Sequence, residues 1–249
     1  MNLNGLPYVI EPMQLRDVAE VMEIERLSFP SPWSARAYRY ELQENNLSHY
    51  LVARSQRPLT QKEPGFGDGP RRELVLSLAL SKACPDLCRR VEGLSKGAVE
   101  RLRRSLGMTA PPGVNILGYG GFWLMAGEAH ISTIAVRPEW RRHGIGELLL
   151  VAMLELAVEL GGDLATLEVR VSNVAAQSLY QKYGFAKMGL RPHYYSDRGE
   201  DALIMTTKHL TSAAFQSAFQ RLKAELRQKL VERFASQPQG VLDSPSTTP

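Results

Sequence analysis

Residues 131–146 read ISTIAVRPEWRRHGIG, and this stretch decides the fold. The apolar run ISTIAV predicts a strand, and residues 144–162, GIGELLLVAMLELAVELGG, predict a core helix that ends at two glycines. The start of a helix leaves several backbone N–H groups unpaired and carries partial positive charge, so a phosphate binds there when no side chain crowds the backbone. Gly144 and Gly146 leave the backbone uncrowded. The stretch predicts either a phosphate-binding helix start or a glycine-rich turn before a core helix.

Two other nucleotide-binding motifs fit this stretch poorly. The dinucleotide fingerprint Gly-x-Gly-x-x-Gly requires a third glycine where Leu149 stands. A P-loop requires Gly-Lys-Ser/Thr, which does not follow Gly144.

The flanking segments alternate between strand and helix patterns. Towards the N-terminus we expect a strand at 8–14, a helix capped by Asp17, a second helix capped by Ser34 and a strand at 49–54. Residues 115–136 predict two strands joined by a turn at 126–128. Further along the chain we expect a strand at 164–171, a helix starting at Asn173, a hairpin over 185–208, and a helix with one apolar face over 211–235. The tail 236–249 has the composition of a disordered segment.

Residues 55–114 differ from their surroundings and predict an insertion between two neighbouring strands. The segment starts with a stretch rich in Pro, Gly and charge at 55–75, and it contains candidate helices at 74–83 and 94–107. Residues 56–115 hold eleven Lys or Arg against six Asp or Glu, an excess of +5, whereas the whole chain carries +4. This basic insertion offers a surface for RNA or an acidic partner, or is simply solvated charge.

Composition places the chain among ordinary globular proteins, with 44% hydrophobic and 22% charged residues. No apolar run reaches the 18 or so residues of a membrane-spanning helix, and the first residues resemble neither a signal nor a transit peptide. Cys84 and Cys88 stand four residues apart without a second ligand pair, so we expect reduced thiols and no metal site. These observations predict a cytoplasmic protein with no membrane partner.

The motif Arg141-x-x-Gly144-x-Gly146 resembles the coenzyme A signature of the GNAT acetyltransferases. Four further pieces are similar to the ribosomal-protein alanine N-acetyltransferases within that superfamily: FPSPW (29–33), LEVR (167–170), SNVAAQSLYQKYGF (172–185) and HYY…EDALIM (193–205). The resemblance covers 8–54 and 115–208. It implies a mixed α/β GNAT fold at 8–208, interrupted by the insertion and followed by the C-terminal helix.

The resemblance also implies which residues carry the chemistry. Glu168 matches the family's general base and Tyr180 its general acid, whereas Tyr183 is a neighbouring tyrosine of the same helix. The alternatives are a carboxylate at Glu168 paired with Arg170 or Arg191, and a core aromatic at Tyr180. Acetyl-CoA is then expected to contact twelve residues: Ile134, Ala135, Val136, Arg141, Arg142, His143, Gly144, Ile145, Gly146, Glu147, Asn173 and Tyr180. A carboxylate introduced at Gly144 is expected to project into the phosphate site, and Asn173 is alternatively an ordinary helix cap.

Substrate recognition is expected at Tyr194, Tyr195, Glu200 and Asp201, where an acidic rim would suit a cationic N-terminus. The alternative is a solvated hairpin turn. The implied reaction is acetyl transfer from acetyl-CoA to a protein N-terminal α-amine, for example the alanine of a ribosomal protein. Other readings are a GNAT enzyme acting on lysine side chains or small amines, and a coenzyme A-binding module without turnover.

Overall fold

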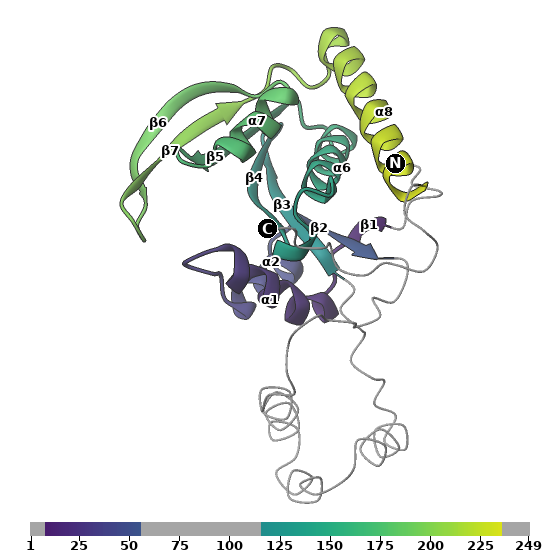
Figure 1. The fold of residues 1–249 in the computed structure, drawn as a ribbon. Helices are drawn as coiled ribbons and strands as arrows, with labels where there is room; N and C mark the ends of the chain where they lie inside the picture. Colours follow the sequence, from purple (N-terminus) through teal and green to yellow (C-terminus); the bar gives the residue numbers. More distant parts are fainter. Residues whose placement is uncertain (1–7, 56–115, 236–249) are drawn as a thin grey trace, which may run out of the picture. The chain divides into compact units, whose positions relative to one another are not determined.

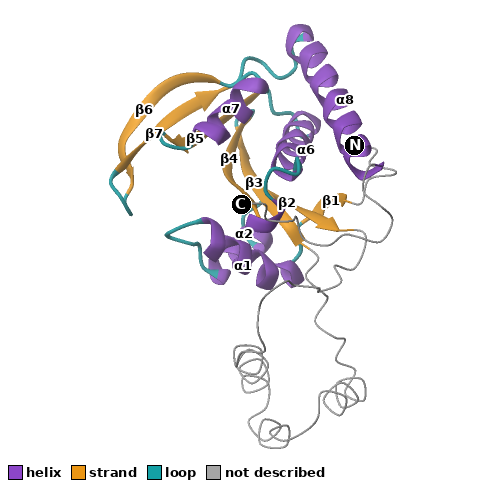
Figure 2. Cartoon of the chain, in the orientation of Figure 1, coloured by secondary structure: helices purple, strands orange, loops and turns teal. Residues whose placement is uncertain are grey.

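The computed structural model describes residues 8–55 and 116–235, which form one compact unit around a seven-stranded sheet (Figures 1 and 2). The predicted helices at 74–83 and 94–107, the two cysteines and the tail 236–249 lie outside the described residues. The strand order is β1-β2-β3-β4-β5-β7-β6. The strands are β1 (Tyr8–Pro12), β2 (Ser48–Ser55), β3 (Ile116–Met125), β4 (Glu128–Val136), β5 (Leu164–Arg170), β6 (Ala186–Tyr195) and β7 (Glu200–Thr206).

Helices cover both faces of this sheet. The α-helices are α1 (Val18–Ser28), α2 (Ala35–Gln43), α6 (Ile145–Glu159), α7 (Val174–Lys182) and α8 (Ala213–Ala235), with short 3-10 helices η1 (Leu15–Asp17) and η2 (Pro138–Trp140). None of the helices within 8–55 and 116–235 is both long and apolar enough to cross a membrane.

Strand β3 shows how the two faces are divided, because alternate residues of a strand point to opposite sides. Gly118 and Gly120 face α6, and a Cβ atom added at Gly120 would lie 3.1 Å from the side chain of Met153. Between them Tyr119 points the other way, where its hydroxyl donates to Glu25 of α1 and accepts from Tyr38 of α2 at 3.0 Å. The glycines therefore let α6 approach closely, and the tyrosine anchors α1 and α2.

Strands β4 and β5 pair over only part of their length. Their parallel pairing runs from Glu128 opposite Leu164 to Ile131 opposite Leu167 and then stops, although β4 continues to Val136. At the same place Gly121 of β3 pairs with Thr133 and the next residue, Phe122, pairs with Ile131. Ser132 of β4 is therefore skipped in the register between the two strands. Such a bulge bends the strand that carries it. The two strands consequently diverge, and in the described structure no strand covers the β5 side of residues 132–136.

Local sequence signals account for several element boundaries. The Ser34 hydroxyl accepts from the N–H of Ala37 at 3.1 Å, and the Asn173 side chain accepts from the N–H of Ala176 at 3.2 Å, as N-caps do. Asp17 does precede α1, but the prediction of a side-chain cap there is wrong. Its carboxylate accepts instead from the N–H of Gln14 at 2.9 Å and pairs with Arg54 at 2.5 Å.

Helix α8 packs on the outer side of α6 (Figure 1). Of the apolar face expected from the sequence, Phe219, Leu226 and Leu230 are buried. The rings of Phe219 and Tyr183 are in contact, with centroids 6.2 Å apart, and Lys223 pairs with Glu155 of α6. Burying side chains of this size contributes roughly 1.5–3 kcal/mol each, so α8 is an integral part of the described unit.

Candidate active site

The start of α6 leaves N–H groups without helical acceptors. The first helical hydrogen bond runs from the N–H of Leu148 to the carbonyl of Gly144 at 2.9 Å, so the N–H groups of Ile145, Gly146 and Glu147 have no acceptor within the helix. Gly144 precedes them with φ of 82°, a left-handed conformation that suits glycine. The positive end of the helix lies beside the end of β4, since a Cβ atom on Gly146 would lie 3.5 Å from Cγ2 of Val136.

The four residues between η2 and α6, Arg141 to Gly144, form a tightly bonded turn. The Arg141 Nε atom donates to the carbonyl of Val136 at 3.2 Å, and Nδ1 of His143 lies 2.8 Å from the carbonyl of Arg141. Arg142 adopts φ of 65°, which is unusual for a residue with a side chain. Its carbonyl accepts from Nη1 of Arg233 at 2.8 Å.

The two glycines of the motif face different neighbours. A Cβ atom added at Gly144 would lie 3.0 Å from Cδ2 of Leu230 in α8, whereas one at Gly146 would meet only Cγ2 of Val136 at 3.5 Å. The expectation that a side chain at Gly144 projects into a phosphate site is therefore wrong, because the Cα–Cβ direction there points at α8. Gly146 is the glycine that faces β4.

Glu168 lies one residue beyond the last pair of β4 and β5, at the fork between the strands. Its side chain is 6% exposed and lies between two nitrogen groups: Nε2 of His130 at 3.0 Å and Nη2 of Arg191 at 3.2 Å. The pairing expected with Arg191 is present. The other arginine named from the sequence, Arg170, pairs instead with Asp197 and Glu200.

His130 was not identified from the sequence, although a histidine within the predicted strand EAHISTIAV was an available signal. It ends a row of stacked rings that starts in the α1–α2 connection. Trp33 stacks on Trp123 with ring centroids 6.2 Å apart, and Trp123 stacks on His130 at 5.8 Å. The buried carboxylate of Glu25 fixes the outer end, since it accepts from the N–H of Trp33 at 2.9 Å. Burial raises the pKa of Glu25.

Tyr195 interacts with both Glu168 and Tyr180. The Tyr195 hydroxyl donates to the carbonyl of Glu168 at 3.3 Å, and its ring lies 3.9 Å from the Arg170 guanidinium carbon. Tyr180 is partly buried; loss of water around its hydroxyl, and secondarily the charge of Tyr195, raise its pKa. The group is therefore protonated at neutral pH and able to donate a proton. Its neighbour Tyr183 is 2% exposed and donates to Glu147 at 2.8 Å, as a core residue does.

The remaining residues expected to contact the cofactor have structural bonds as well. Asn173 uses its carbonyl oxygen as the N-cap of α7, which leaves its amide N–H₂ available. The carboxylate of Glu147 accepts from Lys182 and Tyr183. Gln177, which the sequence did not indicate, is buried and donates to the carbonyls of Arg170 and Val171 at 3.0 and 2.8 Å. It thereby ties α7 to the end of β5.

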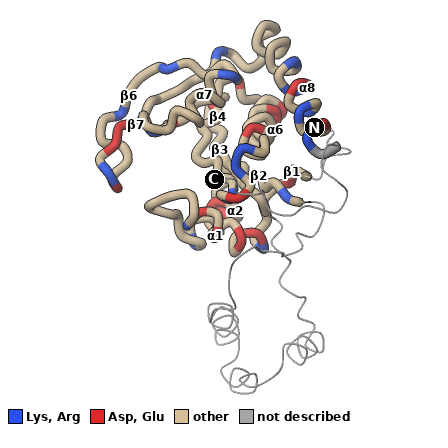
Figure 3. The backbone as a smooth tube through the Cα atoms, viewed as in Figure 1, with Lys and Arg blue, Asp and Glu red and all other residues tan. Residues whose placement is uncertain are grey.

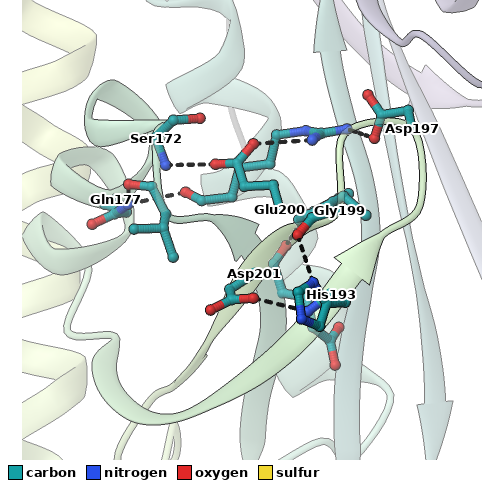
Figure 4. Close-up of polar contacts among 11 residues, drawn as sticks. Ser172, Gln177, His193, Asp197, Gly199, Glu200 and Asp201 are labelled. Carbon is teal, nitrogen blue, oxygen red and sulfur yellow. Dashed lines mark hydrogen bonds and ion pairs between the residues drawn. The ribbon is translucent and has the colours of Figure 1, made fainter.

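The acidic residues of the β6–β7 hairpin are bonded within the protein (Figure 4). Glu200 accepts from Arg170 at 3.0 Å and from the N–H of Ser172 at 2.8 Å, and the Ser172 contact is the first cause that lowers its pKa to about 2. Asp201 accepts from the N–H of His193 at 2.8 Å. These contacts favour a structural role for both carboxylates over a free acidic rim. Tyr194 is 46% exposed, and the guanidinium carbon of Arg191, which pairs with Glu168, lies 5.6 Å from the Tyr194 ring centroid. Tyr194 therefore borders the site.

Comparison with known proteins agrees with this arrangement. The model of the acetyltransferase (GNAT) family matches residues 89–185. Over 196 residues the chain is 33% identical to a Bacillus subtilis (strain 168) protein named as a [ribosomal protein bS18]-alanine N-acetyltransferase, covering 79% of this chain and 92% of the relative. The chain belongs to the GNAT acetyltransferase family. Like other GNAT enzymes, it is an acetyl-CoA-dependent N-acetyltransferase.

Further GNAT relatives support the same assignment. The [ribosomal protein bS18]-alanine N-acetyltransferase of Escherichia coli (strain K12) is 41% identical over 80 residues, which cover 31% of this chain and 54% of that protein. The crystal structure of the ribosomal-protein-S18-alanine N-acetyltransferase from Escherichia coli superposes with a TM-score of 0.52 at 21% identity, covering 80% of this chain and 92% of that one. A chain of the NatC complex bound to Gag peptide and CoA gives 0.51 at 19% identity, covering 82% and 99%. These two structures share the GNAT fold.

Proposed function

We propose that this enzyme acetylates the N-terminal α-amine of a protein, and that its substrate is a ribosomal protein whose N-terminus is alanine. One observation carries the proposal: the buried carboxylate of Glu168 lies at the fork of β4 and β5, between His130 and Arg191. The names of the Bacillus subtilis and Escherichia coli relatives support the choice of substrate.

The divergence of β4 and β5 fits the acyl donor. The N–H of Arg137 bonds towards β3 at Leu117, so the alternate residues Ile134 and Val136 direct their backbone groups away from β3, as a bound amide chain requires. The diphosphate would lie at the free N–H groups of Ile145, Gly146 and Glu147, with Arg141, Arg142 and His143 beside it. Ala135 would contribute by packing, and Asn173 by its free amide. Acetyl-CoA supplies the thioester when bound.

The side chains then handle the protons of the transfer. The amine nitrogen bonds to the acetyl carbon while the carbon–sulfur bond breaks. Glu168 takes the proton that the amine loses, directly or through His130 or a water molecule, and Tyr180 gives its proton to the departing sulfur. Tyr180 suits the donor role because a tyrosine hydroxyl is protonated at neutral pH. No covalent enzyme intermediate is needed.

Free-base populations favour an α-amine over a lysine as the acceptor. With ordinary pKa values near 8 and 10.4, roughly a tenth of α-amines but well under a thousandth of lysine amines are uncharged at pH 7. The acceptor with more free base is the better match for direct attack on the thioester, since only the uncharged amine is a nucleophile. A coenzyme A-binding module without turnover is disfavoured because Glu168 and Tyr180 are both present.

The substrate proposal is tested by measuring thiol release from acetyl-CoA with three matched peptides. One starts with alanine, one is the same peptide with a blocked N-terminus, and one is blocked but carries an added lysine. We expect release with the first peptide only. Release with the blocked lysine peptide would support lysine acetylation instead, and binding of CoA without release from any peptide would support the non-catalytic module.

A further inference from the structure

The last turns of α8 contact the turn that opens the proposed acetyl-CoA site. Arg233 donates from Nη1 to the carbonyl of Arg142 at 2.8 Å. One turn earlier, Leu230 is 3% exposed, and its Cδ2 atom lies 3.0 Å from the position of a Cβ on Gly144. Leu226 is 2% exposed and lies 3.7 Å from the same position. An apolar patch and one charged donor of α8 therefore meet the backbone of residues 142–144.

This turn holds a conformation that needs external support. Arg142 has φ of 65° and Gly144 φ of 82°, so two of three consecutive residues are left-handed. A residue with a side chain keeps such a conformation only where surrounding contacts over-determine it. The carbonyl of Arg142 is held by the hydrogen bond from Arg233, and Gly144 lies against Leu230.

The bond to Arg233 also sets the direction of a neighbouring N–H group. The described chain has no cis peptide bond, and in a trans peptide the carbonyl and the following N–H point in opposite directions. Because the carbonyl of Arg142 points at α8, the N–H of His143 points away from α8. A guanidinium donor at the carbonyl polarises that peptide and strengthens the N–H as a donor to an anion.

A second support comes from the other side of the turn. Trp140 contacts the ring of the buried Tyr8 edge-on, with ring centroids 6.3 Å apart. It also contacts the ring of His143, with centroids 5.7 Å apart. Trp140 therefore joins β1 to the turn.

We propose that α8 is a positioning element of the acyl-CoA site: Arg233 and Leu230 hold residues 141–144 in the conformation that presents backbone N–H groups to the diphosphate. The proposal rests on the proposed function of the α6 start as the diphosphate site. Helix α8 lies outside the residues 89–185 matched by the family model.

The test compares CoA binding by the full chain and its variants by calorimetry, at a temperature where each is folded. Arg233→Ala is expected to weaken CoA binding about tenfold, the usual consequence of losing a charged hydrogen bond, and Leu230→Ala to weaken it similarly. The matched control is Arg227→Ala, an exposed arginine of the same helix, which should bind CoA normally. Arg233→Lys should recover part of the affinity because it restores a charged donor.

Steady-state kinetics and hydrogen exchange separate positioning from general stability. Arg233→Ala should raise the KM for acetyl-CoA with kcat nearly unchanged. In the absence of CoA it should also speed amide exchange at Arg141 and Leu148, whose N–H groups are hydrogen-bonded on either side of the turn. Affinity within twofold of the unmodified chain in a folded Arg233→Ala variant would overturn the proposal. So would equal losses in Arg233→Ala and Arg227→Ala.

A separate variant tests the site itself. Gly146→Glu places a carboxylate on the side of α6 that faces Val136 and should abolish CoA binding. If Gly146→Glu binds CoA normally, the diphosphate lies elsewhere and the proposed site fails together with the role of α8. If Gly146→Glu loses binding while Arg233→Ala does not, the site stands and only the role of α8 is wrong.

Discussion

Glu168 shows how one strand position acquires a function from its neighbours. Its side chain is buried at the first residue beyond the β4–β5 pairing, and it is held by His130 and Arg191. Burying a carboxylate costs free energy unless it is paired, and His130 and Arg191 supply the pairing for Glu168. Tyr180 differs, because a tyrosine hydroxyl is protonated at neutral pH and can serve as a proton donor.

Replacing either residue should lower turnover with little effect on CoA affinity. Glu168→Gln and Tyr180→Phe are each expected to reduce kcat by about 10²–10⁴, the usual contribution of a general acid or base. Tyr183→Phe, a tyrosine three positions along whose hydroxyl bonds Glu147, is the control and should turn over normally. A variant with an unchanged kcat would remove that residue from the proposed mechanism.

The glycines of the signature should respond in opposite ways to alanine. Gly144→Ala forces a side chain into φ of 82° and against Leu230, and should lower the free energy of unfolding by about 1–2 kcal/mol. Gly146→Ala meets only Val136 and lies in the first turn of α6, so it should raise that free energy by about 0.5–1 kcal/mol. Urea unfolding of both variants measures the difference, and a loss in Gly146→Ala equal to that in Gly144→Ala would contradict it.

At the level of elements, one carboxylate joins the turn before β5 to the segment that leads into α8. Asp163 accepts from the hydroxyl of Thr211 at 2.5 Å and lies 2.5 Å from Nδ1 of His209. These bonds, with Thr211 as the first cause, lower its pKa from 3.8 to about 2. The start of α8 is therefore tied to the sheet by a contact that depends on an ionised carboxylate.

This contact predicts a pH dependence of stability. A carboxyl group with a lowered pKa in the folded protein stabilises it fully above the unfolded value near 4, and that contribution disappears as the pH falls towards 2. The free energy of unfolding of Asp163→Asn should therefore fall less steeply between pH 5 and pH 2 than that of the unmodified chain. Glu159→Gln, an exposed carboxylate on α6, is the control and should follow the unmodified chain. Parallel curves for Asp163→Asn and the unmodified chain would exclude the contact.

At the level of the whole molecule, residues 56–115 connect two adjacent antiparallel strands. Arg54 of β2 pairs with Ile116 of β3, so the two ends of the connection lie side by side in the sheet. The chain's positive excess falls within this connection, and in the described residues basic and acidic positions are interspersed along the tube (Figure 3).

Replacing residues 57–112 with a short Gly/Ser linker should leave a folded protein that binds acetyl-CoA, because strands paired at Arg54 and Ile116 can be joined by a short turn. If the basic residues Arg101, Arg103 and Arg104 help to hold a ribosomal substrate, activity on the intact protein should fall more than activity on a short peptide. That gap should shrink as salt rises. Equal losses on both substrates would indicate a structural role, and failure to fold would show that the removed residues complete the core.

The sequence by itself determined most of the elements and the identity of the central motif. Hydrophobic periodicity and capping residues predicted the helix starts at Ser34 and Asn173, because such signals depend only on residues a few positions apart. The motif Arg141-x-x-Gly144-x-Gly146, together with the four further pieces in their order along the chain, indicated the GNAT family. Local rules were less complete at Asp17, whose carboxylate turns back to Gln14 and Arg54.

Only the tertiary structure decided which side chains meet. His130 contacts Glu168 because β4 and β5 are parallel neighbours in a register that places Ile131 opposite Leu167, and no local pattern specifies that register. Gly144 faces α8 because that helix, some eighty residues later, returns to pack on α6. Arg170 bonds Glu200 because their strands, β5 and β7, are antiparallel neighbours in the sheet. Local chemistry selects the elements, whereas the contacts of the site depend on strand order and helix packing across the whole sheet.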